Sequence, residues 1–294
     1  MLLRDFIRSG IEALGHLYPE AEARGIILSL TENILGTRSY THIIEPETVI
    51  APEKLRVLES AMERLSDGEP IQYVIGRTEF CGRVFRVTPD VLIPRPETEM
   101  LCAEAIRIAA PGARILDLCT GSGCIAWTLA LSVPEAHVVG IDVSVAALSV
   151  AASQERLVSV ISSGGEAGAE KSPSFIQADI FGPVPSDLGQ FDLSVSNPPY
   201  VLESEKAAMR RNVLGYEPEL ALFVPDSDPL RFYREIARWA GALLVPGGSG
   251  IVEINEALGE ETAALFRDEG LVSVRILQDF FGKNRFVLFQ KATV

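Results

Sequence analysis

Apolar residues recur at helical spacing in the first quarter of the chain. In Glu20 to Leu35 and again in Glu53 to Leu65, they return every three or four positions, which is typical of an amphipathic helix. Gly36 follows the first stretch and Gly68 the second, and glycine commonly ends a helix. We therefore predict a small helical bundle over residues 1–75, with these stripes as its core.

The pattern changes after this region to short, continuous apolar runs separated by helical stretches. Runs typical of buried strands begin at Arg114, His137, Phe175, Phe191 and Gly250, and two more, Val272 to Asp279 and Phe286 to Gln290, complete seven. Strands that alternate with helices are typical of an α/β fold with a doubly wound sheet. The period alone does not determine the order of the strands. Ser162 to Pro173 is rich in Gly and Ser and is expected to be a flexible insertion without chemistry.

A glycine-containing turn follows the first of these strands. Cys119-Thr120-Gly121-Ser122-Gly123 lies between that strand and an apolar helix that starts at Cys124. Its glycines let the backbone approach a ligand, and the start of the helix has unpaired N–H groups. The next strand ends at Asp142, where a carboxylate can bind both hydroxyls of a ribose. These features predict a nucleotide cofactor, and NAD is compatible with them.

Three further observations favour S-adenosylmethionine. The turn lacks the third glycine that packing around a pyrophosphate usually requires. Asp117 would repel a pyrophosphate, but suits the ammonium group of a methionine moiety, directly or through water. The third strand ends at Asp179-Ile180-Phe181, where an acceptor and apolar side chains could contact an adenine, although Ile180 and Phe181 fit an ordinary core equally well. This strand end is compatible with the cofactor but is not counted among the three observations, the third of which is the sequence after the fourth strand.

Asn197-Pro198-Pro199-Tyr200 follows that strand, at the same sheet edge as the glycine turn. A planar NH2 group is a poor nucleophile, because its lone pair is delocalised, so a site that methylates it must hold the nitrogen in one geometry. The Asn197 side-chain oxygen and the Pro198 carbonyl can accept its two N–H bonds. The prolines stiffen the loop and Tyr200 offers a flat wall for a planar group. Alternatively, these four residues form a turn after a strand and have no catalytic role.

With these motifs the chain resembles the release factor glutamine N(5)-methyltransferases of the HemK type over nearly its whole length. Besides the motifs above, Pro70 to Phe85 is similar to the family's linker hairpin and Val91 to Glu99 to its signature before the catalytic domain. Tyr216-Glu217-Pro218 matches the segment after the active-site loop. Asp279, Gly282 and Arg285 resemble a closing hairpin.

The resemblance implies a Rossmann-like class I methyltransferase domain over residues 97–294, with its last strand inserted antiparallel. A linker hairpin over 76–96 would join it to a helical domain, residues 1–75, that recognises the release factor. The expected substrate-binding residues are Asn197, Pro198, Pro199 and Tyr200, of which Asn197, Pro198 and Tyr200 are expected to be catalytic. The residues expected to bind the cofactor are Asp117, Cys119, Thr120, Gly121, Ser122, Gly123, Asp142, Asp179, Ile180 and Asn197.

The chain departs from the family pattern at a few positions. Cys119 stands where the family usually has Gly, which hints at a different entry into the cofactor turn, and Ile180 where some relatives have an aromatic against the adenine. Asn255 and Leu258 replace a Gly and a Gln, at a strand end that we expect to be remote from the chemistry. Arg95, with the acids after it, either lines a peptide cleft or has a structural role, which we favour.

Composition narrows the choice of substrate. With 26 basic and 40 acidic residues, the formal net charge of −14 argues against a nucleic-acid substrate, since proteins that grip phosphates use clustered Lys and Arg. The alternatives kept open are a glutamine of a ribosomal protein, an adenine amine of DNA or RNA, and a cofactor-binding scaffold without turnover. No long apolar run indicates a membrane segment or secretory signal, so a cytoplasmic location is expected. A monomer is the default expectation. The scattered Cys and His residues predict neither a disulfide framework nor a metal site.

Overall fold

The protein divides into two compact units, each described here by itself. The structure is a computed structural model that describes residues 1–154 and 172–293. One unit comprises Met1–Arg77 with Arg210–Tyr216, and the other comprises Thr78–Met209 with Glu217–Val294. Most of the predicted Gly/Ser-rich insertion, residues 162–171, lies outside the described residues.

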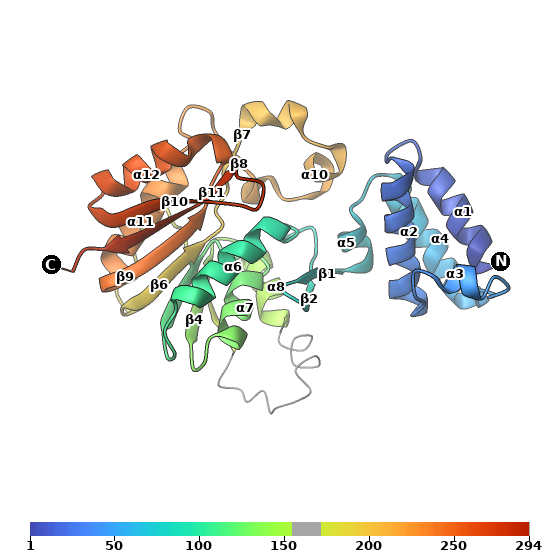
Figure 1. Cartoon of the computed structure of the whole chain (residues 1–294), viewed down its shortest axis with the longest axis horizontal. Helices are drawn as coiled ribbons and strands as arrows, with labels where there is room; N and C mark the ends of the chain where they lie inside the picture. The colour runs from blue at the N-terminus through green and yellow to red at the C-terminus, as the bar shows by residue number, and fades with distance from the viewer. Residues whose placement is uncertain (155–171, 294) are drawn as a thin grey trace. The chain divides into compact units, whose positions relative to one another are not determined.

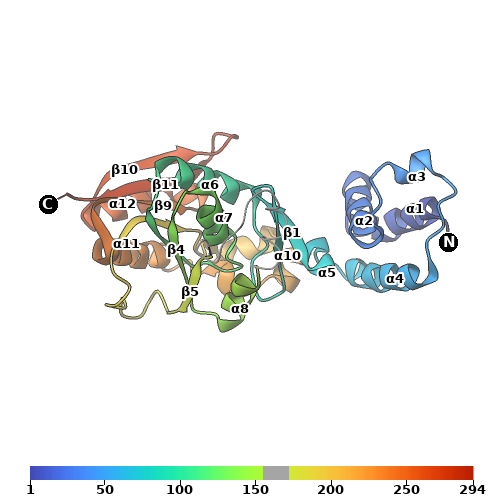
Figure 2. The same ribbon diagram turned by 90° about the horizontal axis from the view of Figure 1, so that it is seen from below.

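The first unit is helical (Figure 2), and its buried side chains form a core of their own. Its helices are α1 (Leu3–Leu14), α2 (Glu20–Leu35), α3 (Thr41–Ile44), α4 (Pro52–Ser66), α5 (Ile71–Ile75) and α10 (Arg211–Tyr216). The apolar stripes on α2 and α4 that the sequence pattern singled out face the core and are buried or half-buried, with Leu30 and Leu58 fully inaccessible. The segment containing α10 joins this unit through an ion pair between Arg210 and Glu22 (2.5 Å) and a hydrogen bond from the Tyr216 hydroxyl to the Asp67 carbonyl (3.0 Å).

The second unit is built on a seven-stranded sheet (Figure 1). Its strand order is β10-β11-β9-β6-β3-β4-β5. The strands are β3 (Arg114–Leu118), β4 (His137–Asp142), β5 (Ser174–Gln177), β6 (Phe191–Ser196), β9 (Leu244–Glu253), β10 (Leu271–Gln278) and β11 (Asn284–Lys291). The five strands from β9 to β5 form four parallel pairs, while β11 is inserted antiparallel to both β9 and β10. The predicted doubly wound, Rossmann-like fold is confirmed, including its antiparallel last strand.

Helices cover both faces of this sheet (Figure 1). On one face α6 (Pro96–Ile108) and α7 (Cys124–Ser132) share a core with side chains of β3, β4, β6 and β9, and α8 (Val145–Ser153) packs beside them. On the other face α11 (Arg231–Leu243) and α12 (Gly259–Asp268) pack on the alternate side chains of the same strands. Burial on both faces explains why the parallel strands are almost continuously apolar.

Smaller elements complete this unit. A hairpin of β1 (Arg77–Phe80) and β2 (Arg83–Arg86) lies within the predicted linker, and β7 (Val201–Leu202) pairs in parallel with β8 (Phe223–Val224). The described residues of this unit also form the short 3-10 helices η2 (Glu203–Ala208), η3 (Glu219–Ala221) and η4 (Glu256–Leu258). Among the described residues, no helix is long and apolar enough to span a membrane. Because β3, β4, β5, β6 and β9 are parallel, the loops after them gather at one edge of the sheet.

Candidate active site

A cavity of about 530 Å³ opens at the carboxyl ends of the parallel strands. Nine of the residues predicted from the sequence line it: Cys119, Thr120, Gly121, Ser122, Asp142, Asp179, Ile180, Asn197 and Pro199. Asp117, Gly123, Pro198 and Tyr200 do not line it. Tertiary folding therefore brings the glycine turn, the strand-end acids and the Asn-Pro-Pro-Tyr loop to one site, as expected for a sheet whose ligands bind at its carboxyl edge.

The glycine turn has the conformation for which its glycines are needed. Gly121 has φ +54° and Gly123 φ +76°, both in the left-handed region. A side chain at Gly123 would come within 2.9 Å of the Ala151 Cβ, whereas one at Gly121 would meet no protein atom within 4 Å. Gly121 thus leaves open a space beside the cavity that a side chain would fill, which suits a ligand lying against the backbone.

Cys119 also has a positive φ, +62°. This is the left-handed conformation that glycine adopts without steric cost, which explains physically why a glycine is expected at this position. The cysteine retains the same turn at the cost of local strain. The turn from Cys119 to Gly123 thus has three residues in the left-handed region, one of which is not glycine.

Asp142 holds the glycine turn in place. One carboxylate oxygen accepts a hydrogen bond from the backbone N–H of Gly121 and the other from that of Ser144, both at 2.9 Å. Burial raises the pKa of Asp142, against the opposing effect of these backbone hydrogen bonds. Each carboxylate oxygen has further lone pairs, so the side chain, which lines the cavity, can still accept from a ligand hydroxyl.

Asp117 lies beneath the cavity rather than on its wall. It is fully buried, and its Oδ2 accepts a hydrogen bond from the Thr120 hydroxyl at 2.6 Å. Its Oδ1 is buried without a hydrogen-bond partner among the described residues. Burial raises the pKa of Asp117 to about 7. A buried acid with an unpaired oxygen, one residue layer from the cavity, fits a cationic ligand group held through Thr120 or water.

The third strand end carries an aromatic pair. Phe181 makes an edge-to-face contact with Phe232, with ring centroids 4.9 Å apart, and the Arg231 guanidinium lies 4.3 Å from the Phe181 centroid. All three residues line the cavity. Ile180 is buried in the core cluster under α11 and also lines the cavity. It is therefore a core residue that could also contact a ligand. Flat apolar and cationic groups of this kind suit a nucleobase.

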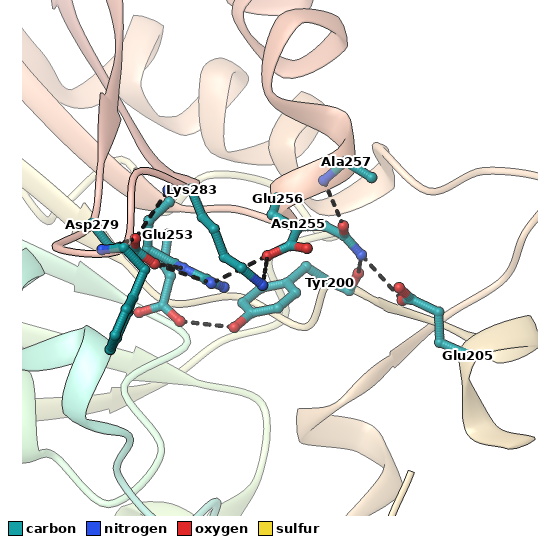
Figure 3. Close-up of polar contacts among 10 residues, drawn as sticks. Tyr200, Glu205, Glu253, Asn255, Glu256, Ala257, Asp279 and Lys283 are labelled. Carbon is teal, nitrogen blue, oxygen red and sulfur yellow. Dashed lines mark hydrogen bonds and ion pairs between the residues drawn. The ribbon is translucent and has the colours of Figure 1, made fainter. Parts of the chain in front are cut away.

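A hydrogen-bonded chain runs under the Asn-Pro-Pro-Tyr loop. The Asn197 side-chain N–H donates to the Thr98 hydroxyl at 3.0 Å, and this hydroxyl donates to Oε2 of Glu253 at 2.8 Å. The Tyr200 hydroxyl donates to Oε1 of the same carboxylate at 2.8 Å (Figure 3). Burial raises the pKa of Tyr200, so its hydroxyl stays protonated and acts as the donor. Both ends of the loop are thereby attached to one buried acid.

Asn255 is not remote from this loop, contrary to the expectation from the sequence. Its side-chain N–H group donates to the Tyr200 carbonyl at 3.3 Å and to the Glu205 carboxylate at 3.1 Å (Figure 3). Its oxygen accepts the Ala257 N–H at 3.0 Å. The sequence expectation failed because β9 lies next to β6 in the sheet, so that the residues following both strands meet at the same edge.

Arg95 and Glu217 form a structural pair. The Arg95 guanidinium contacts Oε1 of Glu217 at 2.6 Å, and the Ile93 N–H donates to Oε2 at 3.2 Å. The Glu217 side chain is 1% exposed. The contact joins the segment before α6 to the segment before η3, and it supports the structural interpretation of Arg95.

Sequence reasoning missed Thr98 and Glu253. Thr98 lies within the signature Val91 to Glu99 and Glu253 within the strand run that begins at Gly250, and neither residue was predicted to belong to the site. One signal was available for Glu253, because it is the acid in the otherwise apolar run from Ile251 to Ile254. A charged group at such a position is rarely buried without partners, and here its side chain has two donors. No comparable local signal marks Thr98.

Comparison with known proteins gives a consistent result. Residues 6–76 match the PrmC N-terminal domain family, and residues 109–239 match the Methyltransferase domain family. The chain is 40% identical over 276 residues to a release factor glutamine methyltransferase of Bacteroides thetaiotaomicron, covering 94% of this chain and 95% of that protein. It is 36% identical to a release factor glutamine methyltransferase of Flavobacterium psychrophilum, with 98% of both chains covered.

A solved structure is also similar. It is a release-factor-specific protein-(glutamine-N5) methyltransferase from Alicyclobacillus acidocaldarius, 29% identical, with 71% of this chain and 99% of that chain covered and a TM-score of 0.39. At this TM-score, the fold assignment depends on the sheet topology described above.

Proposed function

The chain belongs to the release factor glutamine methyltransferase family, and from this premise we propose that it methylates the glutamine of the Gly-Gly-Gln motif in class I peptide chain release factors. The methyl donor in this proposal is S-adenosylmethionine, and the acceptor is the side-chain amide nitrogen. Two relatives of that name, each aligned over more than nine-tenths of this chain, support the reaction class.

The orientation of the Asn197 side chain supports this proposal most directly. Its Nδ2 atom donates to Thr98, so its Oδ1 is left as an acceptor, and Asn197 lines the cavity. Within the described parts of the chain Oδ1 has no hydrogen bond. A free acceptor of fixed orientation at the mouth of a ligand cavity is what an incoming NH2 group requires.

The cavity residues fit the proposed cofactor. Asp142 would hold the ribose hydroxyls, Asp179 with Phe181 would contact the adenine, and the turn around Gly121 would lie along the ligand. Asp117 would neutralise an ammonium group through Thr120 or water. The chemistry supplied by the bound cofactor is an activated methyl group on a sulfonium with a good leaving group.

The protein's own part in this mechanism is orientation. Asn197 Oδ1 and the Pro198 carbonyl would accept the two N–H bonds of the glutamine amide. These bonds fix the nitrogen and stabilise the positive charge that develops on it during transfer. The Tyr200 hydroxyl is already bound to the buried Glu253 carboxylate, so we assign Tyr200 to holding the loop rather than to contacting the substrate. Precise positioning of two reacting groups can supply a large part of a rate enhancement.

The proposal is tested by offering labelled S-adenosylmethionine with class I release factors, ribosomal proteins, DNA and RNA in parallel. Mass spectrometry should find one added methyl on the glutamine of the release factor's Gly-Gly-Gln motif. Label on a ribosomal protein or on nucleic acid instead would overturn the substrate assignment. No label on any of them would favour a binding scaffold.

The role of Asn197 is tested with the Asn197→Ala variant. Losing one fixed acceptor of a developing charge typically costs on the order of 100-fold in turnover, and we expect a loss of that size here. Cofactor affinity, measured by calorimetry, should remain measurable. Asn284→Ala, the same change on β11 outside the cavity, should retain turnover. Wild-type turnover in Asn197→Ala would contradict the assignment.

A further inference from the structure

We propose that Thr98 and Glu253 are positioning residues. They determine whether the Asn197 amide presents its oxygen or its NH2 group to the substrate. The inference rests on the proposed function only for the identity of the substrate. Thr98 lines the same cavity, in the first turn of α6, and Glu253 ends β9 behind it. Neither residue needs to contact the transferred group for this role.

The number of protons in this chain of hydrogen bonds determines the orientation of the Asn197 amide. A threonine hydroxyl has one proton, and that of Thr98 lies 2.8 Å from a carboxylate oxygen, which can only accept when ionised. Once this proton points to Glu253, the Thr98 oxygen can only accept from Asn197, 3.0 Å away. Asn197 must then turn its NH2 group to Thr98 and its oxygen away from Thr98. Glu253 thus selects one of the two orientations of the amide.

The anchor of this chain is held rigidly. Glu253 is 1% exposed, and β9 pairs with β11 at this point through Glu253 and Phe286. The Tyr200 hydroxyl occupies its second carboxylate oxygen, and the Tyr233 hydroxyl donates to its backbone carbonyl at 3.2 Å. A side chain fixed at several points loses little further freedom when the substrate binds, so the orientation it imposes is maintained.

The chain also connects separate parts of the fold. Asn197 follows β6, Thr98 is on α6 and Glu253 is on β9, with Thr98 and Glu253 155 residues apart in the sequence. The Thr98 hydroxyl therefore links Asn197, the acceptor, to Glu253, which holds the chain of hydrogen bonds in place. If it is removed, the Asn197 amide can rotate, and its NH2 group, which repels the N–H bonds of the substrate, can face the cavity.

Two substitutions at Thr98 separate the hydroxyl from the shape of the side chain. Thr98→Val keeps the shape and removes the hydroxyl, while Thr98→Ser keeps the hydroxyl and removes a methyl group. Thr262→Val is a matched control, because Thr262 is also buried and, among the described residues, its hydroxyl bonds only the carbonyl of Leu258, the residue before α12. Comparing the three variants distinguishes positioning from the general cost of deleting a buried hydroxyl.

We expect kcat for methylation to fall about 10- to 100-fold in Thr98→Val, since misplacement of one catalytic group by about 1 Å can have such an effect. The affinity for S-adenosylmethionine should stay close to that of the wild type. Thr98→Ser should restore most of the lost kcat, and Thr262→Val should retain the wild-type kcat. Equal losses in the Val and Ser variants, or no loss in Thr98→Val, would overturn the proposal.

A second measurement does not depend on activity. The side-chain NH2 resonances of Asn197, identified as the pair missing from the 15N spectrum of Asn197→Ala, should shift in Thr98→Val and in Glu253→Gln. They should be unaffected in Thr262→Val. Unchanged resonances in both variants would show that the amide does not depend on this chain of hydrogen bonds, and would refute the proposal.

The two measurements distinguish failure of the inference from failure of the proposed function. If wild-type protein labels no release factor while the Asn197 resonances respond to Thr98→Val, the substrate assignment fails and the positioning role holds. If the release factor is methylated equally by wild type and Thr98→Val, only the positioning role fails.

Discussion

At the scale of single residues, burial governs the acids around the cavity. The pKa values of Asp117, Asp142 and Glu253 are all raised, and desolvation is the largest cause for each. Asp142 and Glu253 have hydrogen-bond donors on both carboxylate oxygens, whereas Asp117 keeps one oxygen unpaired. Burial makes ionisation of Asp117 costly, and a nearby cation would lower that cost. This is consistent with a role of Asp117 in binding a cationic group.

The raised pKa of Asp117 predicts a pH dependence of stability. Its pKa is about 7 in the folded protein, against 3.8 for an unperturbed Asp. Stability from this group is thus fully present below about pH 4 and is lost as pH rises through 7. The difference corresponds to about 4 kcal/mol. Denaturant unfolding of ligand-free protein at a series of pH values measures it.

Asp117→Asn should remove the pH-dependent contribution of this carboxyl group to stability. The free energy of unfolding of the variant should then fall less between pH 4 and 8 than that of the wild type. Asp268→Asn, the same change at an exposed site, is the control. Parallel pH profiles for wild type and Asp117→Asn would contradict the prediction.

At the scale of elements, the contact between β9 and β11 explains a glycine inside a strand. Gly250 pairs across the strands with Phe289, and a Cβ at Gly250 would lie 2.1 Å from the end of the Phe289 ring. That ring is fully buried and packs edge-to-face on Phe266, with centroids 4.7 Å apart, so it has little room to move. The glycine admits the ring that fills this face of the sheet.

Gly250→Ala should therefore destabilise the protein by about 1 to 3 kcal/mol through overpacking. Gly241→Ala is the matched comparison, because Gly241 is exposed on α11 and a Cβ there meets nothing within 4 Å. That variant should be more stable than the wild type by up to about 1 kcal/mol, from helix propensity. Denaturant titrations compare them, and equal stabilities for the two variants would show that the Phe289 contact is not tight.

At the scale of the whole molecule, the two units have separate cores. The core of the helical unit is formed mainly by α1, α2 and α4, and the described residues that line the cavity all belong to the sheet unit. If the helical unit recognises the protein substrate, then damage to its core should change recognition of that substrate without changing the cofactor site.

Leu30→Ala tests this division of roles, because Leu30 is fully buried in α2. Loss of a buried leucine costs about 2 to 5 kcal/mol, here expected within the helical unit. The KM for the release factor should rise, while the Kd for S-adenosylmethionine should be unchanged. Leu244→Ala, the same change in β9, should instead lower the temperature at which cofactor binding is lost. A weakened cofactor Kd in Leu30→Ala would argue against separate roles.

The sequence by itself determined the features that depend on local spacing. Helix α2 begins and ends where its apolar period predicts, and the apolar runs identify all seven strands of the sheet, although β9 begins at Leu244, six residues before the predicted Gly250. The glycine turn and Asp142 could be identified because a strand, a tight turn and a helix place their residues within one short stretch, where φ angles and side-chain types are constrained together.

Only the tertiary structure decided which distant residues meet. Thr98 and Asn197 are 99 positions apart, and the hydrogen bonds joining them to Glu253 exist because α6 and β9 pack beside β6. The nearness of Asn255 to Tyr200 has the same origin. Periodicity shows which face of an element is buried but not against which partner, since strand order and helix packing are set by the free energy of the whole core.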